Sequence, residues 1–475
     1  MHQNDRTIIS NRGLWWVLLA LVCLVAGVAC LFVEPLIVIA LIVVLANIAL
    51  VAKYPYYGLL VYLFISLIRP AEIYPSLAAL RMELLLGALV LLSIVINQKI
   101  LTGRVLLPRD RITVALGVFL VAISLSIFTS YEATVTKDTI VEFIKILVFY
   151  YLIVSLVDTR KRFITFVATF VLLVSYIAFD ALAGYLSGQF VHTMDVDRLT
   201  GTTSAGGDAN TLATTLVTTT PMLIATALYY RHWLVRSFLA LVTLTMTYLV
   251  IITASRGGLL AFFSVVFGGI GFARRKLALV VVVFLLSVAA WAVMPDQYRE
   301  RYAAFAEVTE DINSASSGRW EIWGAGLRMI IARPLLGVGA GAFPWAYGSG
   351  DFGPPQMMSS HNVYIQVLAT TGLVGFAAWV IFLYILMKTL NETARRARKL
   401  PDNQWYVLFR NSFFVILIAL FVSGMFGHSL FRYTWYVVAA LAASMANIMT
   451  SHEAEMKKAL DETSDSEQDL AVTEA

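Results

Sequence analysis

Five arginines lie in one polar, aromatic segment that interrupts the apolar runs of this chain, and a histidine comes directly after it. The segment extends from Pro295 to Ser360 and is followed directly by His361. Its arginines are Arg299, Arg301, Arg319, Arg328 and Arg333. Guanidinium groups bind phosphate oxygens through a planar fork, and neutral imidazole accepts a proton near physiological pH. These residue types indicate a site that holds anionic groups and moves a proton.

Two further arginines lie between apolar runs, at positions expected on the same side of the membrane as this segment. Arg256 occurs in a Ser-Arg-Gly-Gly sequence, and an arginine at membrane depth is costly without a partner. Arg198 precedes a Gly-, Ser- and Thr-rich stretch that opens the next apolar run, and helix N-termini attract anions. With Arg319, they are the candidate anion ligands. The other arginines of the long segment are expected to be solvated or to face lipid headgroups.

Each of these residues also has a purely structural interpretation. His361 could cap a helix or form a hydrogen bond at the membrane interface, and Arg256 could extend to lipid headgroups. Asp180, Glu142 and Lys145 lie inside apolar runs and could form structural pairs between helices. No GxxxxGK[ST] phosphate loop, Cys/His cluster or outer acidic pair stands out in the sequence. We therefore expect no metal, no cofactor and no nucleic-acid partner, with the arginines taking the part that a metal would otherwise play.

The composition identifies the elements that must position these residues. The chain has 475 residues, of which 59% are hydrophobic and 14% charged, and its mean hydropathy is +0.79. Soluble domains contain about 25% charged residues, so the sequence predicts an all-α integral membrane protein. Apolar runs long enough to cross a bilayer predict about 12–14 transmembrane helices. The runs are 14–33, 35–52, 57–68, 82–97, 112–129, 139–157, 163–187, 211–229, 234–254, 257–273, 277–294, 362–389, 408–426 and 430–449.

The distribution of basic residues predicts the orientation. If the N-terminus is cytoplasmic, about 23 of the 35 basic residues face the cytoplasm, as the positive-inside rule favours. Both termini are then cytoplasmic and the long segment is outside. Four regions follow: N-terminal transmembrane helices (1–294), a large outer loop (295–361), C-terminal transmembrane helices (362–449) and a disordered acidic tail (450–475).

The outer loop itself is expected to contain short helices. A Ser317 cap and the spacing of Trp320, Trp323, Leu327 and Ile330 predict an amphipathic helix that ends at Arg333-Pro334. Gly337 to Gly341 is expected to be a flexible turn, and the Pro- and Gly-rich stretch after it could move as a lid.

Taken together, these motifs resemble the O-antigen ligase and polymerase superfamily of bacterial envelope glycosyltransferases. The resemblance rests on an outer Arg-x-x-Gly…Asn-x-x-Ala segment, the Ser-Arg-Gly-Gly hairpin, and Gly-Arg-x-x-x-Trp followed by Pro-x-x-Gly-x-Gly-x-Gly in the loop. A closing His-Asn-x-Tyr…Gly-x-x-Gly completes it. The residues that carry it are Arg198, Gly201, Asn210, Ala213, Arg256, Gly318, Arg319, Trp323, Pro334, Gly337, Gly339, Gly341, His361, Asn362, Tyr364, Gly372 and Gly375.

The resemblance implies a membrane glycosyltransferase C-type fold in the bacterial inner membrane, with a periplasmic active site. The donor would be a glycan on undecaprenyl diphosphate, bound by Arg198, Arg256 and Arg319, with Asn210, Asn362, Tyr364 and Trp323 in support. His361 would act as general base on the acceptor, which is lipid A-core in a ligase. A polymerase would use another lipid-linked repeat, and a protein O-oligosaccharyltransferase would use Ser or Thr. A multi-span transporter with charged residues lining a pathway is the alternative from another class.

Overall fold

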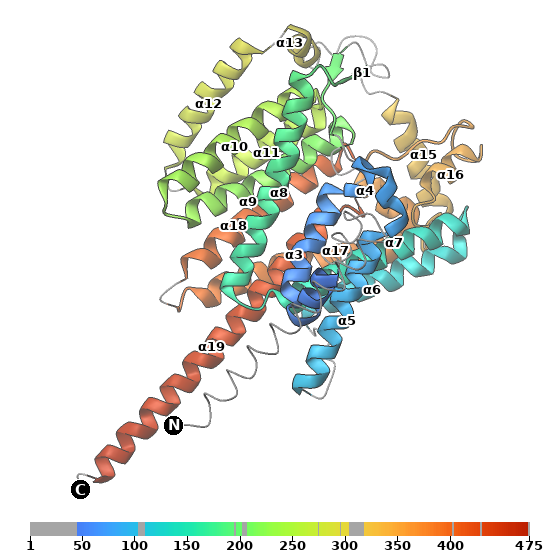
Figure 1. Ribbon diagram of the computed structural model, residues 1–475. Helices are drawn as coiled ribbons and strands as arrows, with labels where there is room; N and C mark the ends of the chain where they lie inside the picture. The colour runs from blue at the N-terminus through green and yellow to red at the C-terminus, as the bar shows by residue number, and fades with distance from the viewer. Residues whose placement is uncertain are drawn as a thin grey trace, which may run out of the picture.

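The chain folds into a bundle of long helices with short helices and a β-hairpin gathered at one end. The computed structural model describes residues 45–102, 110–193, 196–201, 207–273, 275–294, 296–303, 318–400, 403–427 and 430–473. The hairpin, α13, α15 and α16 lie toward the upper end in Figure 1, whereas the C-terminus projects from the lower end. The all-α membrane architecture expected from the sequence is confirmed, since nine described helices are long and apolar enough to cross a membrane.

The described elements are as follows in chain order. The helices are α3 (Pro55–Ile68), α4 (Pro70–Ile73), η1 (Pro75–Leu80), α5 (Met82–Thr102), α6 (Arg111–Leu125), η2 (Ser126–Thr129), α7 (Ala133–Leu156), α8 (Arg160–Leu186), α9 (Ala209–Tyr229), α10 (Trp233–Ile252), α11 (Arg256–Phe272), α12 (Lys276–Val293), α13 (Asp296–Ala303), α15 (Arg319–Ala332), α16 (Phe343–Gly348), α17 (Val363–Ala397), α18 (Gln404–Gly424) and α19 (Tyr433–Thr473). Strands β1 (Val191–Thr193) and β2 (Val196–Arg198) form the antiparallel hairpin.

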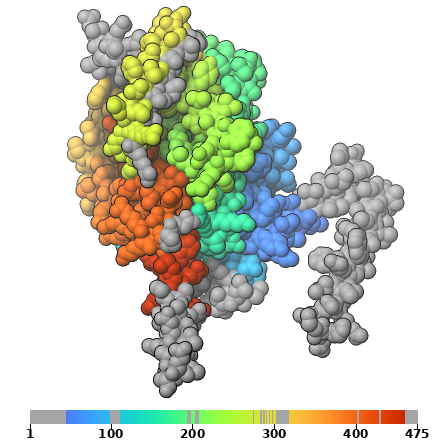
Figure 2. Space-filling view, turned by 90° about the vertical axis from the view of Figure 1, so that its left-hand side faces the viewer, coloured from blue at the N-terminus to red at the C-terminus, as the bar shows by residue number. Residues whose placement is uncertain are grey.

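These helices follow the apolar runs closely, because each run supplies a helix with enough hydrocarbon surface to face lipid. The first expected span and most of the second fall outside the described residues. The expected spans 257–273, 277–294 and 430–449 correspond to α11, α12 and the first part of α19. Figure 2 shows α10 to α12, coloured yellow-green to yellow, above the orange and red helices of the C-terminal part.

Helix α9 is the most buried of the nine candidate spans and packs against α8, α10, α11 and α18. Its many threonines are compatible with this position because their hydroxyls donate to the helix's own carbonyls. Thr219 and Thr220, for example, bond the carbonyls of Thr215 and Leu216 at 2.8 and 2.9 Å. A buried hydroxyl that bonds a backbone carbonyl avoids the cost of an unsatisfied polar group. The first turn of this central helix carries Asn210.

Helix α17 is broken near its start, which the continuous apolar run 362–389 did not predict. Gly372 has φ +63° and ψ −167°, so the helix is interrupted there. The segment Pro334–Gly341 fills the interruption: the amides of Val338 and Gly339 donate to the carbonyls of Ala369 and Thr370 at 2.9 and 3.0 Å. The backbone groups freed by the break are thus bonded by the loop.

The glycine-rich segment Gly337–Gly341 forms turns, as expected, but other parts of the chain pack on both of its sides. Its other side lies against η2 and the start of α7, where Thr129 donates to the Gly337 carbonyl at 2.7 Å and Tyr131 to the Val338 carbonyl at 3.0 Å. Because a side chain at Gly339 or Gly341 would overlap hydroxyls of this wall, the glycines allow close approach of two backbones.

The predicted helix of the outer loop is present as α15, but it buries a different face from the one expected. Its buried residues are Ile322, Ala325, Gly326 and Met329. Trp320 and Leu327 of the predicted face are 57% and 55% exposed. The small Ala325 and Gly326 let α15 approach α17 closely, since an added Cβ at Gly326 would overlap Ile365. The predicted cap, Ser317, lies outside the described residues; the described N-cap is Gly318, with φ +72°.

The acidic tail also differs from expectation, because α19 continues as a helix to Thr473. Thirteen of the 26 tail residues are Ala, Glu, Lys or Leu, which favour helix, and the tail continues a helix that is already nucleated. Its start is tied to the bundle: Nε of Arg396 donates to Glu453 at 3.0 Å, and the hydroxyl of Tyr406 lies 3.1 Å from Nδ1 of His452.

Candidate active site

The hairpin and the start of α9 bring Arg198 and Asn210 together. Arg198 ends β2, and the next residue, Leu199, is fully buried and donates its amide to the carbonyl of Ile252 at 3.3 Å. Nε of Arg198 donates to the Thr253 carbonyl at 3.1 Å, and Nη2 donates to Oδ1 of Asn210 at 3.0 Å. Two edges of one guanidinium thus join the end of α10 to the beginning of α9.

Ser255 connects this pair to the start of α11. Its hydroxyl donates to the same Oδ1 of Asn210 at 2.8 Å and accepts the amide of Gly258 at 3.1 Å, which caps the helix. The preceding Ala254 is buried and has φ +51°, an uncommon conformation for a residue with a side chain. Arg256 follows as the first residue of α11. Asn210 therefore acts as a shared acceptor that fixes Arg198 and Ser255, one residue from Arg256.

Arg319 is the first residue of α15 and lies near Arg256. Its guanidinium lies over the ring of Phe426 at 5.9 Å, and a Cβ added to Gly257 would lie 2.8 Å from Cβ of Phe426. Burial and the nearby charge of Arg256 lower the pKa of Arg319. Two arginines from segments more than sixty residues apart in the sequence therefore lie close enough for their charges to interact, and Phe426 packs beside the helix start that carries each of them.

His361 lies at the start of α17 in a strained backbone conformation. Its φ is +47°, in the left-handed region that disfavours side chains. The residues on both sides are fixed. The buried Ser360 accepts Nε1 of Trp323 at 3.0 Å through its carbonyl, and Asn362 accepts the amides of Tyr364 and Ile365 at 2.9 and 3.2 Å. Strain of this kind is often found at functional sites.

The supporting residues predicted from the sequence each have a definite contact. Trp323 lies one turn after Arg319 on α15 and joins that helix to the residue before His361. Asn362 is the N-cap of α17, and the hydroxyl of Tyr364 donates to the carbonyl of Phe421 in α18 at 2.9 Å. Trp323 thus connects α15, which begins at Arg319, to the backbone beside His361, and Phe426 lies between Arg319 and the start of α11.

The local electrostatics favour an anion. Arg256 and Arg319 are each the first residue of a helix, and α9 and α17 also begin beside them. The start of a helix carries a positive partial charge, so a cation placed there is unfavourable and an anion is favourable. An anionic group between the two arginines would offset both their mutual repulsion and the helix dipoles.

Arg432 is a part of this region that sequence reasoning missed. It precedes α19, and its Nη2 and Nη1 donate to the hydroxyl and carbonyl of Thr211 at 2.9 and 3.4 Å. Asp208 caps α9 by accepting the amides of Asn210 and Thr211 at 2.9 and 3.0 Å. Burial favours the neutral form of Asp208, but these hydrogen bonds and the charge of Arg432 hold its pKa below the ordinary value. The available sequence signal was an arginine at the junction of the last two apolar runs.

Three other arginines of the outer segment are at least partly exposed, as expected, and each also donates to a backbone carbonyl. Arg299 donates to the Met294 carbonyl at 3.0 Å, Arg328 donates to the Phe352 carbonyl, and Arg333 donates to the Thr129 carbonyl at 3.2 Å. Carbonyl groups at loop ends need such donors. The side chain of Arg301 lies outside the described part of the structure.

Two of the intramembrane charges, Lys145 and Glu142, pair within one helix rather than between helices. Lys145 bonds Glu142 within α7 at 2.5 Å, and the two side chains are 53% and 64% exposed. Asp180 is half-buried on α8. A pair exposed on one helix surface gives little support to a transport pathway through the bundle.

Comparison with known proteins matches part of the chain to a protein family. Residues 241–380 match the family model described as O-antigen ligase. This segment is similar to O-antigen ligases, which supports the superfamily resemblance found in the sequence motifs. The segment matching the O-antigen ligase model contains Arg256, Arg319, Trp323, His361 and Tyr364, whereas Arg198 and Asn210 precede it and join it through their contacts with Thr253 and Ser255. No curated protein matches the chain.

The described residues contain no group of three or more His, Cys, Asp or Glu side chains arranged to hold a metal ion. The charged groups that converge in this region are guanidinium groups. The arrangement can bind a multiply charged anion.

Proposed function

We propose that this chain is an O-antigen ligase that transfers a glycan from undecaprenyl diphosphate to lipid A-core. The observation that carries the proposal is the placement of Arg256 and Arg319 at the starts of two helices that meet at Phe426, where their charges interact. Like charges at helix N-termini are unfavourable by themselves and become favourable around an anion. A diphosphate provides several oxygens for bidentate guanidinium contacts, and Arg198 is the third ligand.

In this proposal His361 accepts the proton of the acceptor hydroxyl. The hydroxyl oxygen forms a bond to the anomeric carbon of the donor sugar, the bond from that carbon to the diphosphate oxygen breaks, and the configuration inverts. Arg198, Arg256 and Arg319 stabilise the charge that develops on the leaving diphosphate. Preorganised groups of this kind contribute roughly 3–4 kcal/mol each to transition-state stabilisation in other enzymes. Because the arginines supply this charge, we propose that transfer does not depend on a metal.

The acceptor is the least constrained part of the proposal. We favour lipid A-core because the Gly-Arg-x-x-x-Trp and His-Asn segments resemble the ligase branch and the matching family model is described as O-antigen ligase. A polymerase that extends a lipid-linked repeat and a protein O-oligosaccharyltransferase would use the same residues with another hydroxyl group. We also propose that the enzyme lies in the bacterial inner membrane, with the site periplasmic and both termini cytoplasmic.

The test uses purified full-length protein, an undecaprenyl-diphosphate-linked glycan and lipid A-core, with and without a chelator. A mobility shift of the lipid that persists with chelator and disappears in the Arg319→Ala and His361→Ala variants supports a metal-independent ligase. Lengthening of the donor alone identifies a polymerase, and no change in either lipid directs the search to protein acceptors. Normal transfer by a correctly inserted His361→Ala protein contradicts the general-base assignment.

A further inference from the structure

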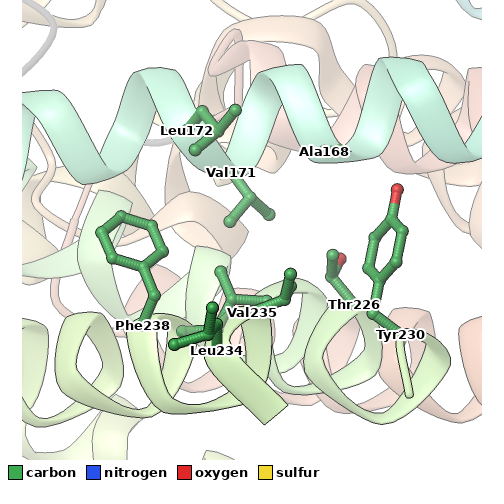
Figure 3. A pocket seen from close by; sticks show the side chains of 9 residues that line it. Ala168, Val171, Leu172, Thr226, Tyr230, Leu234, Val235 and Phe238 are labelled. Atoms are coloured by element: carbon green, nitrogen blue, oxygen red, sulfur yellow. The ribbon is translucent and has the colours of Figure 1, made fainter. Parts of the chain in front are cut away.

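A cavity of about 390 Å³ lies among α8, α9 and α10, away from the candidate active site (Figure 3). Its volume is in the range typical of sites for small ligands. The lining is almost entirely apolar: Ala168, Val171, Leu172, Thr226, Tyr230, Leu234, Val235, Phe238 and Leu239. Figure 3 shows Val171 and Leu172 of α8 opposite Leu234, Val235 and Phe238 of α10, with Thr226 and Tyr230 at one end.

The cavity and the candidate active site lie at opposite ends of α9. Asn210 is in the first turn of that helix, whereas Thr226 is 16 residues farther along. At 1.5 Å per residue this separation is about 24 Å. The arginines and His361 therefore do not reach the cavity, and its ligand is not held by the diphosphate site.

Hydrocarbon fits the cavity walls. The side chains of Leu172, Leu234 and Phe238 line it and are 53%, 53% and 43% exposed, so the cavity opens to the outer surface of the bundle. That surface faces lipid in a membrane protein. The hydroxyl of Thr226 donates to the carbonyl of Met222 at 2.8 Å, so it does not require a polar ligand. An acyl chain satisfies these walls without leaving a polar group unbonded.

Positive charge lies beside the mouth. Tyr230 lines the cavity and is followed by Arg231, and Nε of Arg236 donates to the Tyr230 carbonyl at 2.8 Å. Both arginines are exposed, and Trp233 between them is 69% exposed, as is common for tryptophan at a membrane interface. No Asp or Glu occurs in the sequence between Asp208 and Asp296. The cations at this mouth thus have no acidic neighbour along the chain to neutralise them.

We infer that this cavity binds one acyl chain of an anionic phospholipid whose headgroup contacts Arg231 and Arg236. Basic residues beside a cleft between transmembrane helices are suited to anionic headgroups. A zwitterionic phospholipid with the same acyl chains fits the cavity equally well but gains less from the two arginines. The binding is therefore selective for headgroup charge.

The experiment measures lipid binding to the purified full-length protein by native mass spectrometry, with phosphatidylglycerol and phosphatidylcholine of identical chains and with a polyprenyl phosphate. Phosphatidylglycerol is expected to bind more tightly than phosphatidylcholine. Arg231→Gln with Arg236→Gln should weaken its binding by roughly thirtyfold, which corresponds to about 2 kcal/mol. Arg275→Gln, in the next loop, is the control for loss of a basic charge.

A second pair of variants tests the cavity itself. Ala168→Phe places a ring in the cavity and should abolish binding of phosphatidylglycerol, whereas Ala240→Phe, on the exposed face of α10, should not. Equal binding of the two phospholipids by the unaltered protein overturns the inference, as does unchanged phosphatidylglycerol binding in Ala168→Phe. Tighter binding of polyprenyl phosphate than of phosphatidylglycerol also overturns it and indicates that the cavity takes the donor lipid instead.

Discussion

His361 combines a proton-accepting side chain with a backbone conformation that its residue type disfavours. The hydrogen-bonded residues on both sides, Ser360 and Asn362, maintain that conformation. A histidine at φ +47° is held in a costly conformation, and strain of this kind clusters at functional sites. Glycine adopts this conformation without strain. Comparing glycine with alanine at position 361 therefore separates the effect on stability from the effect on proton transfer.

We expect His361→Gly and His361→Ala both to lose roughly 10²- to 10⁴-fold in transfer rate, as removal of a general base does. The glycine variant should be more stable than the alanine variant by about 1 kcal/mol, because only alanine keeps the left-handed strain. Thermal unfolding in detergent and the glycan-transfer assay measure the two effects. His192→Ala is the control, since His192 is an exposed histidine of the hairpin paired with Asp197. Equal stability of the two His361 variants would contradict the strain argument.

Asp208 makes the start of α9 sensitive to acid. Its folded-state pKa is below the ordinary value, so its ionised form stabilises the folded protein above about pH 4. That contribution is lost as the pH falls through the lower folded-state pKa. Asp208→Asn keeps a good helix cap but has no charge for Arg432. We expect the variant to unfold at a lower temperature than the unaltered protein at pH 6, with the difference disappearing in strong acid. A difference independent of pH would contradict this.

The sequence alone was enough to propose the residues of the candidate site, but not to identify the residues that hold them in place. Arg198, Arg256, Arg319 and His361 stand out because polar groups are rare in an apolar sequence. Asn210 was identified by its motif, but its role as a shared acceptor depends on Ser255, 45 residues away. Arg432 contacts Thr211 across 221 residues, and no local pattern carries that information.

The glycines of the outer loop show how two helices and a loop form one packed unit. Gly339 lies against Ser130 and Thr136 of the η2–α7 region, while its amide bonds α17. Gly350 also has a positive φ, +92°, but an added Cβ would meet nothing within 4 Å. Both positions therefore require a positive φ, but only at Gly339 would an added side chain overlap neighbouring atoms.

Gly339→Ala should lower the unfolding temperature much more than Gly350→Ala. Alanine at Gly350 is expected to cost only the left-handed conformation, about 1–2 kcal/mol. Alanine at Gly339 has the same cost and also overlaps the Ser130 hydroxyl, so either the loop or α7 must move. Thermal unfolding of both variants in the same detergent measures this difference. Similar losses would show that crowding at Gly339 is relieved without cost.

Sequence periodicity located the helices but not their faces or interruptions. In α15, hydrophobic spacing favoured the face of Trp320 and Leu327, whereas the buried face uses Ala325 and Gly326, small residues that allow close packing on α17. The break at Gly372 lies within an apolar run and is stabilised by a loop more than thirty residues earlier. The length of an apolar run predicts a transmembrane helix. A break within that helix depends on the segment elsewhere in the chain that bonds the freed backbone groups.

The bundle as a whole separates the candidate active site from the C-terminal end of α19, which projects at the other end in Figure 1. The proposed orientation places Ser349, beside α16, in the periplasm and Lys457, on α19, in the cytoplasm. Both side chains are exposed and suited to cysteine labelling. The two native cysteines, Cys23 and Cys30, must first be replaced.

In that cysteine-free background we expect Ser349→Cys to react with a membrane-impermeant maleimide in intact cells with a permeable outer membrane. Lys457→Cys should react only after lysis, because the excess of basic loops keeps that end in the cytoplasm. Labelling of both positions in protein solubilised in detergent controls for accessibility. The reverse pattern in cells would invert the orientation and place the candidate site in the cytoplasm.

The insertion of Gly337–Gly341 between the η2–α7 wall and the broken α17 also limits how the outer loop can be exchanged between relatives. A chimera that receives only residues 318–361 from a related protein would carry glycines whose neighbours in the η2–α7 region come from a different sequence. Ser126–Thr139 and Ala369–Gly372 would have to be transplanted with the loop, because these three segments share their backbone hydrogen bonds. Acceptor specificity, where it lies in this loop, is thus transferable only as a three-part unit.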